Sequence, residues 1–300
     1  MPLAIAAVAL LVAGTTARAD TTIEVDDCGA RISARQRGVL QHDVSCGHHC
    51  SDTPAVACDP GDVAGACGGS RGTCVADGIV LENHATLDLN GHTVQATSDA
   101  TVVTCELPAR VHGRCAVHGP GTLLGAKGRG IDGGTMDLEV RDVTFGSFAH
   151  AIFTQGRMVA SGLATLPDWA NEIQVVGNVV LRRSHVNGLA GVSGAEVYVA
   201  DVAVGPDGGE VRAGRSLRGR GVLLRGQTSL HGRRILLRDV TATSGESFLP
   251  SSIGAEDTLR LVASRVAEIS AGRRPVLIQS TCERSRVFGE DETWGVCSGD

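Results

Sequence analysis

The chain has 300 residues and a formal net charge of −6, with 27 Lys and Arg against 33 Asp and Glu. This mild acidity argues against a nucleic-acid partner, because a phosphate backbone demands a basic face. Aromatic residues make up only 3% while glycine contributes 40 residues. Few rings and many glycines suit thin, repeatedly turning layers better than a large globular core.

Residues 1–19 have the features of a secretory signal peptide. An apolar segment from Leu3 to Ala13 precedes Ala17-Arg18-Ala19, the small-x-small pattern of a signal peptidase site. The segment is too short to span a bilayer, and no later run approaches the required ~20 residues. We expect cleavage near Ala19, no membrane span, and a secreted or periplasmic location.

Ten cysteines, an even number in an exported chain, predict disulfides rather than metal ligands. Cys105 with Cys115 and Cys282 with Cys297 are natural local pairs. Residues 20–76 are read as a Cys-rich N-terminal cap and insertion, and residues 281–300 as a disulfide-closed C-terminal cap. The cap's six cysteines allow 15 pairings among themselves, so their pairing stays open. These six are Cys28, Cys46, Cys50, Cys58, Cys67 and Cys74.

A repeat fills residues 77–280. Its first copy is Thr86 to Val94, in which Leu87, Leu89, His92 and Val94 occupy inward positions 0, 2, 5 and 7 on either side of an Asn90-Gly91 bend. Most copies start about 20 residues apart, a period typical of a solenoid. The predicted starts are Leu87, Val117, Leu138, Met158, Val179, Val197, Ile235 and Leu259.

A bend column and a third strand complete each coil. The position four after each start is usually Gly or Asp, residues that tolerate a left-handed backbone. The column reads Gly91, Gly121, Asp142, Gly162, Arg183, Asp201, Asp239 and Ala263. Third strands are expected near residues 78–81, 130–133, 150–153, 191–193, 221–224, 253 and 276–278. Three strands per coil predict a triangular tube of about eight coils.

These residues resemble the secreted right-handed parallel β-helix proteins of the pectate-lyase-like superfamily. The resemblance rests on Cys28-Gly29, Asp43-Val44-Ser45-Cys46, the run Leu87 to Val94, and Gly119-Pro120-Gly121-Thr122-Leu123, and covers residues 28 to about 280. It implies an all-β, single-stranded right-handed parallel β-helix of three sheets with a disulfide-rich N-terminal cap. It also implies that Cys28 pairs with Cys46, leaving Cys50, Cys58, Cys67 and Cys74 to hold the insertion. The superfamily includes polysaccharide lyases, hydrolases, adhesins and a metal-handling protein, so the fold does not select a function.

The first sheet, where the lyases and hydrolases carry their groove, offers few catalytic groups here. Its expected outward column holds a single acid, whereas uronate cleavage or hydrolysis needs several. Asp132 and Phe153, one coil apart, are a candidate sugar contact, with the alternative of a solvated acid and a covered ring. The expected column is Val80, Asp132, Phe153, Ser193, Leu223 and Leu277.

Two further candidate sites lie elsewhere on the tube. Asp88, His118 and Glu139 are expected to stack on the second sheet as a cation or acid/base cluster, or as a merely solubilising ladder. Residues 205–220 are expected to form a loop that binds an anionic ligand, with a solvated loop as the alternative. The loop's basic side chains are Arg212, Arg215, Arg218 and Arg220.

The N-terminal histidines suggest a third activity. His48 and His49 between Cys46 and Cys50, with His42 nearby, could form a zinc or copper site, although disulfides explain the cysteines better. We therefore assign no metal ligands. The expected function is noncatalytic binding of a glycan or surface partner. The alternatives are a polysaccharide lyase or glycoside hydrolase acting on an acidic polysaccharide, with calcium as cofactor if a lyase, and periplasmic metal handling.

Overall fold

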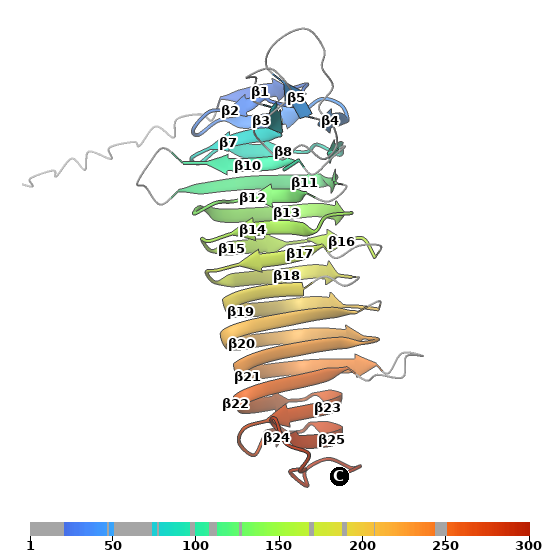
Figure 1. The fold of residues 1–300 in the computed structure, drawn as a ribbon. Coiled ribbons are helices and arrows are strands. Elements are labelled where there is room, and N and C mark those ends of the chain that lie inside the picture. Colours follow the sequence, from blue (N-terminus) through green and yellow to red (C-terminus); the bar gives the residue numbers. More distant parts are fainter. Residues whose placement is uncertain are drawn as a thin grey trace, which may run out of the picture.

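The molecule is an all-β parallel solenoid, as predicted, with about nine turns instead of the eight expected. The computed structural model describes residues 21–46, 48–50, 74–76, 78–96, 100–107, 113–125, 128–167, 171–187, 191–206, 208–243 and 251–300, with the backbone alone for 48–50 and 74–76. Figure 1 shows a rod that runs in chain order from β1 (Thr22–Val25) at one end to β25 (Thr281–Val287) at the other. No helix in the described part is long and apolar enough to cross a membrane.

The coils stack their strands in three parallel sheets, of which the first runs along one face of the rod. Each strand pairs with the equivalent strand of the next coil. The first sheet contains β2 (Arg31–Ile32), β7 (Ile79–Glu82), β10 (Val103–Glu106), β12 (Arg129–Asp132), β14 (His150–Thr154) and β17 (Glu172–Val175). It continues with the first parts of β19 (Gly191–Val204), β20 (Gly209–Arg225), β21 (Thr228–Thr243) and β22 (Ser252–Val262), and with the last parts of β23 (Arg265–Ala271) and β25.

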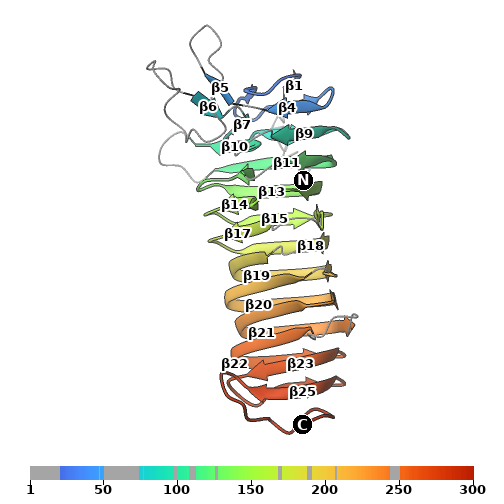
Figure 2. The ribbon, with the colours of Figure 1, turned by 45° about the vertical axis from the view of Figure 1, so that its right-hand side comes forward.

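The second and third sheets follow in each coil. From β19 to β21 a single long strand passes through all three sheets, and Figure 2 shows these strands curving round the rod. The second sheet contains β1, β3 (Arg37–Leu40), β8 (Thr86–Asp88), β11 (Arg114–Leu124), β13 (Asp137–Gly146), β15 (Met158–Ser161), β18 (Val179–Val186), the middle of β19 to β21, the end of β22, and β24 (Val276–Ile278). The third contains β4 (Val44–Cys46), β9 (Thr93–Ala96), β16 (Ala164–Thr165), the last parts of β11, β13 and β18 to β21, and the first parts of β23 and β25.

The N-terminal segment already belongs to the solenoid. β2, β3 and β4 pair in parallel with β7, β8 and β9, so parallel pairing begins before residue 77. The Cys28–Cys46 disulfide closes this segment, as the resemblance implied. β5 (His48–Cys50) and β6 (Cys74–Ala76) form a separate antiparallel pair in which Cys50 lies opposite Cys74. Cys58, Cys67 and the expected signal peptide, residues 1–19, lie outside the described residues.

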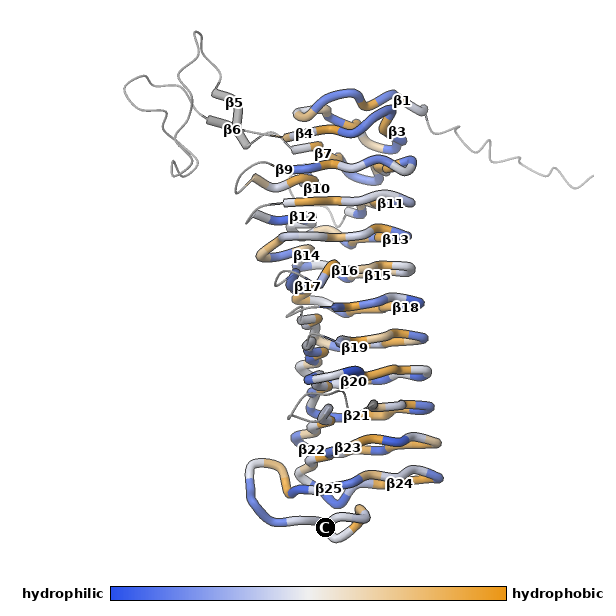
Figure 3. Tube along the Cα trace, turned by 90° about the vertical axis from the view of Figure 1, so that its right-hand side faces the viewer, coloured by the Kyte–Doolittle hydropathy of each residue, from blue (hydrophilic) through white to orange (hydrophobic). Residues whose placement is uncertain are grey.

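The core is a continuous column of aliphatic side chains along the rod axis. The predicted inward sets starting at Leu138, Met158, Val179, Val197 and Leu259 are all buried. Figure 3 shows hydrophobic and hydrophilic residues alternating along the strands, as the period of two requires.

Several inward assignments in the early coils were wrong. The His92 side chain is 31% exposed and faces Asp43, with Nδ1 3.5 Å from its Oδ1. In the next coil Leu123 is the buried residue, whereas Gly119, Thr122 and Leu124 are only half-buried. In this second coil the cause is an irregularity in the pairing between His118 and Gly121 that adds one residue to the strand and shifts the pattern.

The bend column is a genuine left-handed turn between the second and third sheets. Seven of the eight predicted positions have positive φ, including Arg183 at 46° and Ala263 at 49°; Gly121 is not among them. At Gly162, where φ is 65°, glycine is favoured by conformation, and an added Cβ would also lie 2.0 Å from Oδ1 of Asp142 and would displace that carboxylate.

A coil between Val197 and Ile235 was missed. Leu217, Gly219, Val222 and Leu224 fit the 0, 2, 5, 7 template, and Gly221 at the bend has φ 61°. Gly219 replaces the usual branched side chain, which hid the coil and gave eight coils instead of about nine. Residues 221–224 consequently lie in the third sheet, not in the first. Residues 276–278 were also assigned wrongly to the first sheet and lie in the second, because the first-sheet strand of that coil is the last part of β23.

The C-terminal end is closed as predicted by the Cys282–Cys297 disulfide, and Cys105–Cys115 links β10 to β11. Burial would raise the pKa of the Asp300 carboxyl, but hydrogen bonds from the Ser285 hydroxyl and from backbone N–H groups of Cys297, Ser285 and Val296 outweigh it and lower the pKa to about 2. The carboxylate therefore ties the end of the chain across the last coil.

Candidate anion-binding face

The outward side chains of the second sheet form rows along the rod, two of which run from β13 to β24, while a shorter one contains Glu196, Ser216, Arg234 and Thr258. Since strands pair in register, equivalent residues of successive coils lie about 4.8 Å apart. The Glu139 row comprises Glu139, Val159, Val180, Tyr198, Arg218, Leu236, Arg260 and Val276. The Arg141 row comprises Arg141, Ser161, Arg182, Ala200, Arg220, Arg238, Val262 and Ile278.

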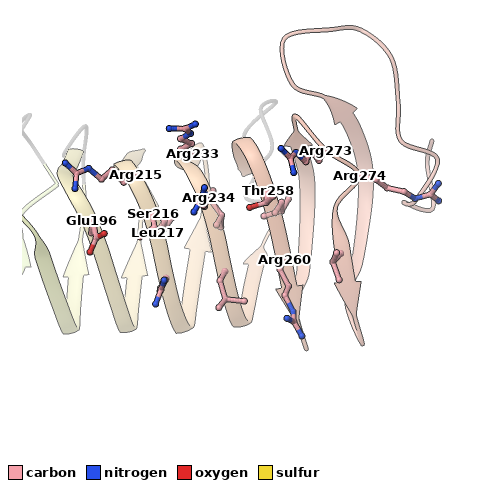
Figure 4. A pocket seen from close by; sticks show the side chains of 15 residues that line it. Glu196, Arg215, Ser216, Leu217, Arg233, Arg234, Thr258, Arg260, Arg273 and Arg274 are labelled. Carbon is pink, nitrogen blue, oxygen red and sulfur yellow. The ribbon is translucent and has the colours of Figure 1, made fainter.

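An open groove with a volume of about 650 Å³ lies over the C-terminal half of this sheet. In Figure 4, Arg215, Arg233 and Arg273 stand near the bends where strands enter the sheet, and Arg260 lies farther along its strand. The only carboxylate lining the groove belongs to Glu196. Its lining includes seven arginines, namely Arg215, Arg218, Arg233, Arg234, Arg260, Arg273 and Arg274; we call it the arginine groove.

Most of these guanidinium groups are not neutralised. Asp257 lies beside the groove, with its carboxylate 3.6 Å from Arg234 and 2.9 Å from Arg273. Among the described residues, no carboxylate forms an ion pair with the other five. The groove is therefore a concentrated positive region on a chain whose net charge is −6.

The side chains between the arginines are mainly apolar. Leu236 is 45% exposed and Val276 50% exposed, and both line the groove. Tyr198 lies next to Arg218 in the same row but is not part of the lining, and its ring has the guanidinium of Arg182 over it, with Cζ 6.0 Å from the ring centroid. A planar guanidinium matches a carboxylate or sulfate with two parallel hydrogen bonds, while aliphatic and aromatic side chains accept the apolar face of a sugar ring. The groove thus combines both kinds of contact along one line.

A second charged cluster lies at the N-terminal half of the same sheet, around Glu139. The Glu139 carboxylate is 6% exposed and paired with both Arg114 and Arg141, and its Oε1 lies 3.6 Å from Nε2 of His118. Desolvation by burial lowers the pKa of His118, and the nearby Arg141 charge lowers it further. A neutral imidazole therefore sits beside an ion-paired carboxylate.

The predicted Asp88, His118 and Glu139 ladder is corrected in its register. Asp88 and His118 are partners on successive coils, but His118 aligns with Arg141, and Glu139 with Ala116. This change of register is caused by the extra residue between His118 and Gly121. Glu139 still reaches His118, while Asp88 forms an ion pair with Arg37, so the cluster is an interlocked set of ion pairs.

The predicted arginine loop is a strand. Residues 209–225 form β20, and its four arginines point from different parts of the coil. Arg218 and Arg220 lie in the two second-sheet rows, and Arg215 lies at the bend before them. Arg212 lies on the first sheet between Ser193 and His231, and its Nε is 3.9 Å from Glu210. Three of the four therefore belong to the second-sheet face or its edge.

Asp132 and Phe153 are adjacent on the first sheet, as predicted. Both side chains contact Arg129, which sequence reasoning missed. The Arg129 guanidinium forms an ion pair with Asp132, and its Cζ lies 4.3 Å from the centroid of the Phe153 ring. The ring face that a sugar would stack on therefore already carries a cation.

The first sheet also holds an unexpected pair of carboxylates. Glu82 and Glu106 are register partners on adjacent coils, and Arg31 lies between them, 3.4 Å from the first and 2.6 Å from the second. Sequence reasoning missed this pair because it did not predict β10. With the arginine bridging them, both carboxylates are engaged.

Comparison with known proteins adds no relative: no protein-family model, curated protein or solved structure matches the chain. Within the described ranges, no group of three or more His, Cys, Asp and Glu side chains could hold a metal ion. Among the residues considered as a metal site, Cys46 is in the disulfide with Cys28, and His42 Nδ1 lies 3.9 Å from Oδ1 of Asp26. The side chains of His48, His49 and Cys50 lie outside what the structure describes.

Proposed function

We propose that the protein binds a linear acidic polysaccharide along the second sheet, without cleaving it. The observation that carries this proposal is the arginine groove, in which seven arginines line about 650 Å³ and five of them form no ion pair within the described part of the chain. Clustered unpaired cations attract an anionic ligand and accelerate its association. The rigid rod presents them in a line suited to a polymer.

Arginine is the residue type that suits carboxylates and sulfates. Lys127 is the only lysine in the chain, so the positive face is built from planar guanidinium groups that bind such anions in a bidentate manner. The interspersed Leu236 and Val276 supply apolar contact that a sugar ring needs and a simple ion does not. A glycan with acidic groups uses both features.

The groove lacks what a glycosidase or lyase would use. Glycoside hydrolysis requires two carboxyl groups on either side of the bond, and calcium requires several oxygen ligands. Glu196 is the only acidic residue that lines the groove. Noncatalytic binding is therefore the function that this site supports best.

We also propose that the chain is exported and belongs to the pectate-lyase-like superfamily. Three disulfides among the described residues support an oxidising compartment. The Leu87 to Val94 run, and a parallel solenoid with three sheets around it, support the superfamily assignment.

A glycan array with the purified chain tests the binding proposal. We expect binding to carboxylated or sulfated polysaccharides, weakening as salt rises because the contacts are ionic. The matched ligand control is the same glycan after chemical reduction of its carboxyl groups, which should not bind. Binding to neutral glycans alone, or a blank array, would refute the proposal, and release of unsaturated or reducing products from a bound glycan would refute its noncatalytic part.

A further inference from the structure

The arginine groove carries arginines on both of its sides. One side follows the bends where strands enter the second sheet and carries Arg215, Arg233 and Arg273 (Figure 4); we call it the bend side. The other side is part of the Glu139 row and carries Arg218 and Arg260; we call it the sheet side. Positions three residues apart on a strand, such as Arg215 and Arg218, are about 10 Å apart. A ligand in the groove therefore lies between two lines of cations.

The charge of the groove is far from balanced. Seven arginines line it, whereas Glu196 is the only acidic residue in the lining and Asp257 is the only described carboxylate that pairs with any of the seven. Glu256, which precedes Asp257, lines a separate hollow. Seven positive charges against two negative ones leave an excess of five. All seven arginines are exposed, so a ligand can reach each of them.

This excess is too dense for a glycan with one anion per sugar. The arginines lie on β20, β21, β22 and the segment before β24, which span three strand spacings, or about 14 Å. One sugar with its glycosidic oxygen is about as long as one strand spacing, so about four sugars cover this length. They bring at most four anions, and fewer reach the sheet if successive sugars are turned over. An arginine that is covered without being paired loses water and gains no anion, which is unfavourable.

The lining between the arginines suits a sugar better than a nucleic acid. Leu236 and Val276 are exposed on the sheet side, and the hydroxyls of Ser216 and Thr258 lie between the two sides. These groups accept the apolar face and the hydroxyls of a sugar ring. Single-stranded nucleic acid stacks its bases on aromatic side chains, and none of the described residues that line the groove is aromatic.

Building on the proposed acidic-polysaccharide function, we propose that the ligand is a polysulfated glycan with more than one anionic group per sugar, bound along the groove with anions paired on both sides. A uronic acid carries a single carboxylate, whereas each free hydroxyl of a sugar can be esterified with sulfate. Sulfation therefore places anions on both edges of the same sugar. A guanidinium binds each sulfate with two parallel hydrogen bonds.

Titration calorimetry at one fixed ionic strength tests this with three oligosaccharides of equal length and the same backbone, alternating glucuronate and N-acetylgalactosamine. The first has no sulfate, the second has one sulfate per disaccharide and the third has two, so that only the third has more than one anion per sugar. We expect affinity to rise along the series, with the third binding at least about tenfold more tightly than the first, a difference of about 1.4 kcal/mol.

Removing either side of the groove should reduce this preference. The bend-side variant is Arg215→Gln/Arg233→Gln, and the sheet-side variant is Arg218→Gln/Arg260→Gln. In each variant the sulfates on one edge of the chain lose their partners, so we expect about half of the free-energy difference to be lost and the preference to fall from about tenfold to about threefold. The four arginines are exposed and form no ion pair among the described residues, so folding should be retained; thermal denaturation checks this.

The control Arg212→Gln/Arg284→Gln removes the same charge from the first sheet and should leave the preference unchanged. An equal loss of preference in the control would show a general attraction between charges and would overturn the two-sided site. A loss in only one of the two groove variants would overturn it as well.

The outcomes separate this inference from the proposed function. If the unsulfated or monosulfated chain bound as tightly as the disulfated one, the requirement for more than one anion per sugar would be wrong while glycan binding remained. Absence of binding to every acidic glycan would overturn the proposed function too. If inorganic polyphosphate or single-stranded DNA displaced the bound glycan at lower concentration than the disulfated chain itself, a phosphate polymer would be the better ligand and the inference would be wrong.

Discussion

Glu139 shows how a single carboxylate organises the N-terminal half of the second sheet. Its side chain is 6% exposed and is held by Arg114 and Arg141, which are each more than half exposed. The carboxylate needs these cations because an unpaired buried charge is strongly unfavourable, whereas the arginines can turn to water. In this cluster Glu139 neutralises the arginines, whereas most arginines of the arginine groove have no carboxylate partner among the described residues.

Glu139→Gln should destabilise the protein by about 2 kcal/mol. Removing one partner of a wholly buried pair costs about 3–5 kcal/mol, and the exposure of both arginines reduces that cost here. Chemical denaturation measures the change in the free energy of unfolding. The matched control is Glu210→Gln, whose exposed ion pair with Arg212 at 3.9 Å should contribute less than about 1 kcal/mol. Equal effects of the two substitutions would contradict this interpretation of the cluster.

At the scale of the coil, the left-handed bend is the element that repeats most faithfully. It carries glycine or aspartate in most coils, but Ala263 adopts φ 49° without a side chain suited to it. A left-handed alanine costs about 1–2 kcal/mol, while glycine loses about 0.5–1 kcal/mol in backbone entropy. The two effects favour glycine at this position.

Ala263→Gly should therefore stabilise the protein by about 0.5–1 kcal/mol, measured by chemical denaturation. Gly162→Ala is the opposing control, because its Cβ would lie 2.0 Å from Oδ1 of Asp142 and must displace that side chain. It should destabilise the protein. A loss of stability in Ala263→Gly would show that the bend is not strained there.

The coils were predictable wherever four inward side chains were large and regularly spaced. Coils starting at Leu138 or Val197 have this property, and their burial was predicted correctly. The coil starting at Leu217 was missed because Gly219 has no side chain to bury, and because its many arginines made the segment look like an exposed loop. An extra residue before Gly121 likewise displaced the register of the second coil, since periodicity alone does not reveal an insertion.

For the candidate site, the sequence predicted that arginines bind an anion but not which arginines lie together. Arg215, Arg218 and Arg220 were recognised as an anion-binding set, but their partners Arg233, Arg260 and Arg273 come from later coils. Their proximity depends on strand register between coils, which depends in turn on the missed coil. A correct register would have revealed the groove.

At the scale of the whole molecule, the rod depends on closed ends, because an open β-solenoid end would offer unpaired strand edges to other chains. Asp300 closes the C-terminal end with hydrogen bonds to Ser285 and to the backbone of Val296 and Cys297. Its pKa is lowered from 3.8 to about 2. The ionised form therefore stabilises the fold above pH 3.8, and this contribution is lost as the pH falls through about 2.

Asp300→Asn should lower the Tm at pH 6, and the difference from the unsubstituted protein should shrink between pH 3.8 and about 2. Thermal denaturation across this range measures it. Asp291→Asn, an exposed change in the same terminal segment, is the matched control and should have no comparable effect. A Tm difference that does not depend on pH would contradict a role for the ionised carboxylate.

The central claim is that the ligand binds to the second sheet. The most direct test is the affinity for the acidic glycan of a double variant that carries Arg218→Gln and Arg260→Gln. Each charged hydrogen bond contributes about 1.5–3 kcal/mol, so titration calorimetry should show a loss of at least about tenfold. The control Arg212→Gln/Arg284→Gln removes the same charge from the first sheet and should change the affinity little. Equal losses in both variants would show a general effect of charge, and a loss confined to the control would place the ligand on the first sheet; either result would contradict the account.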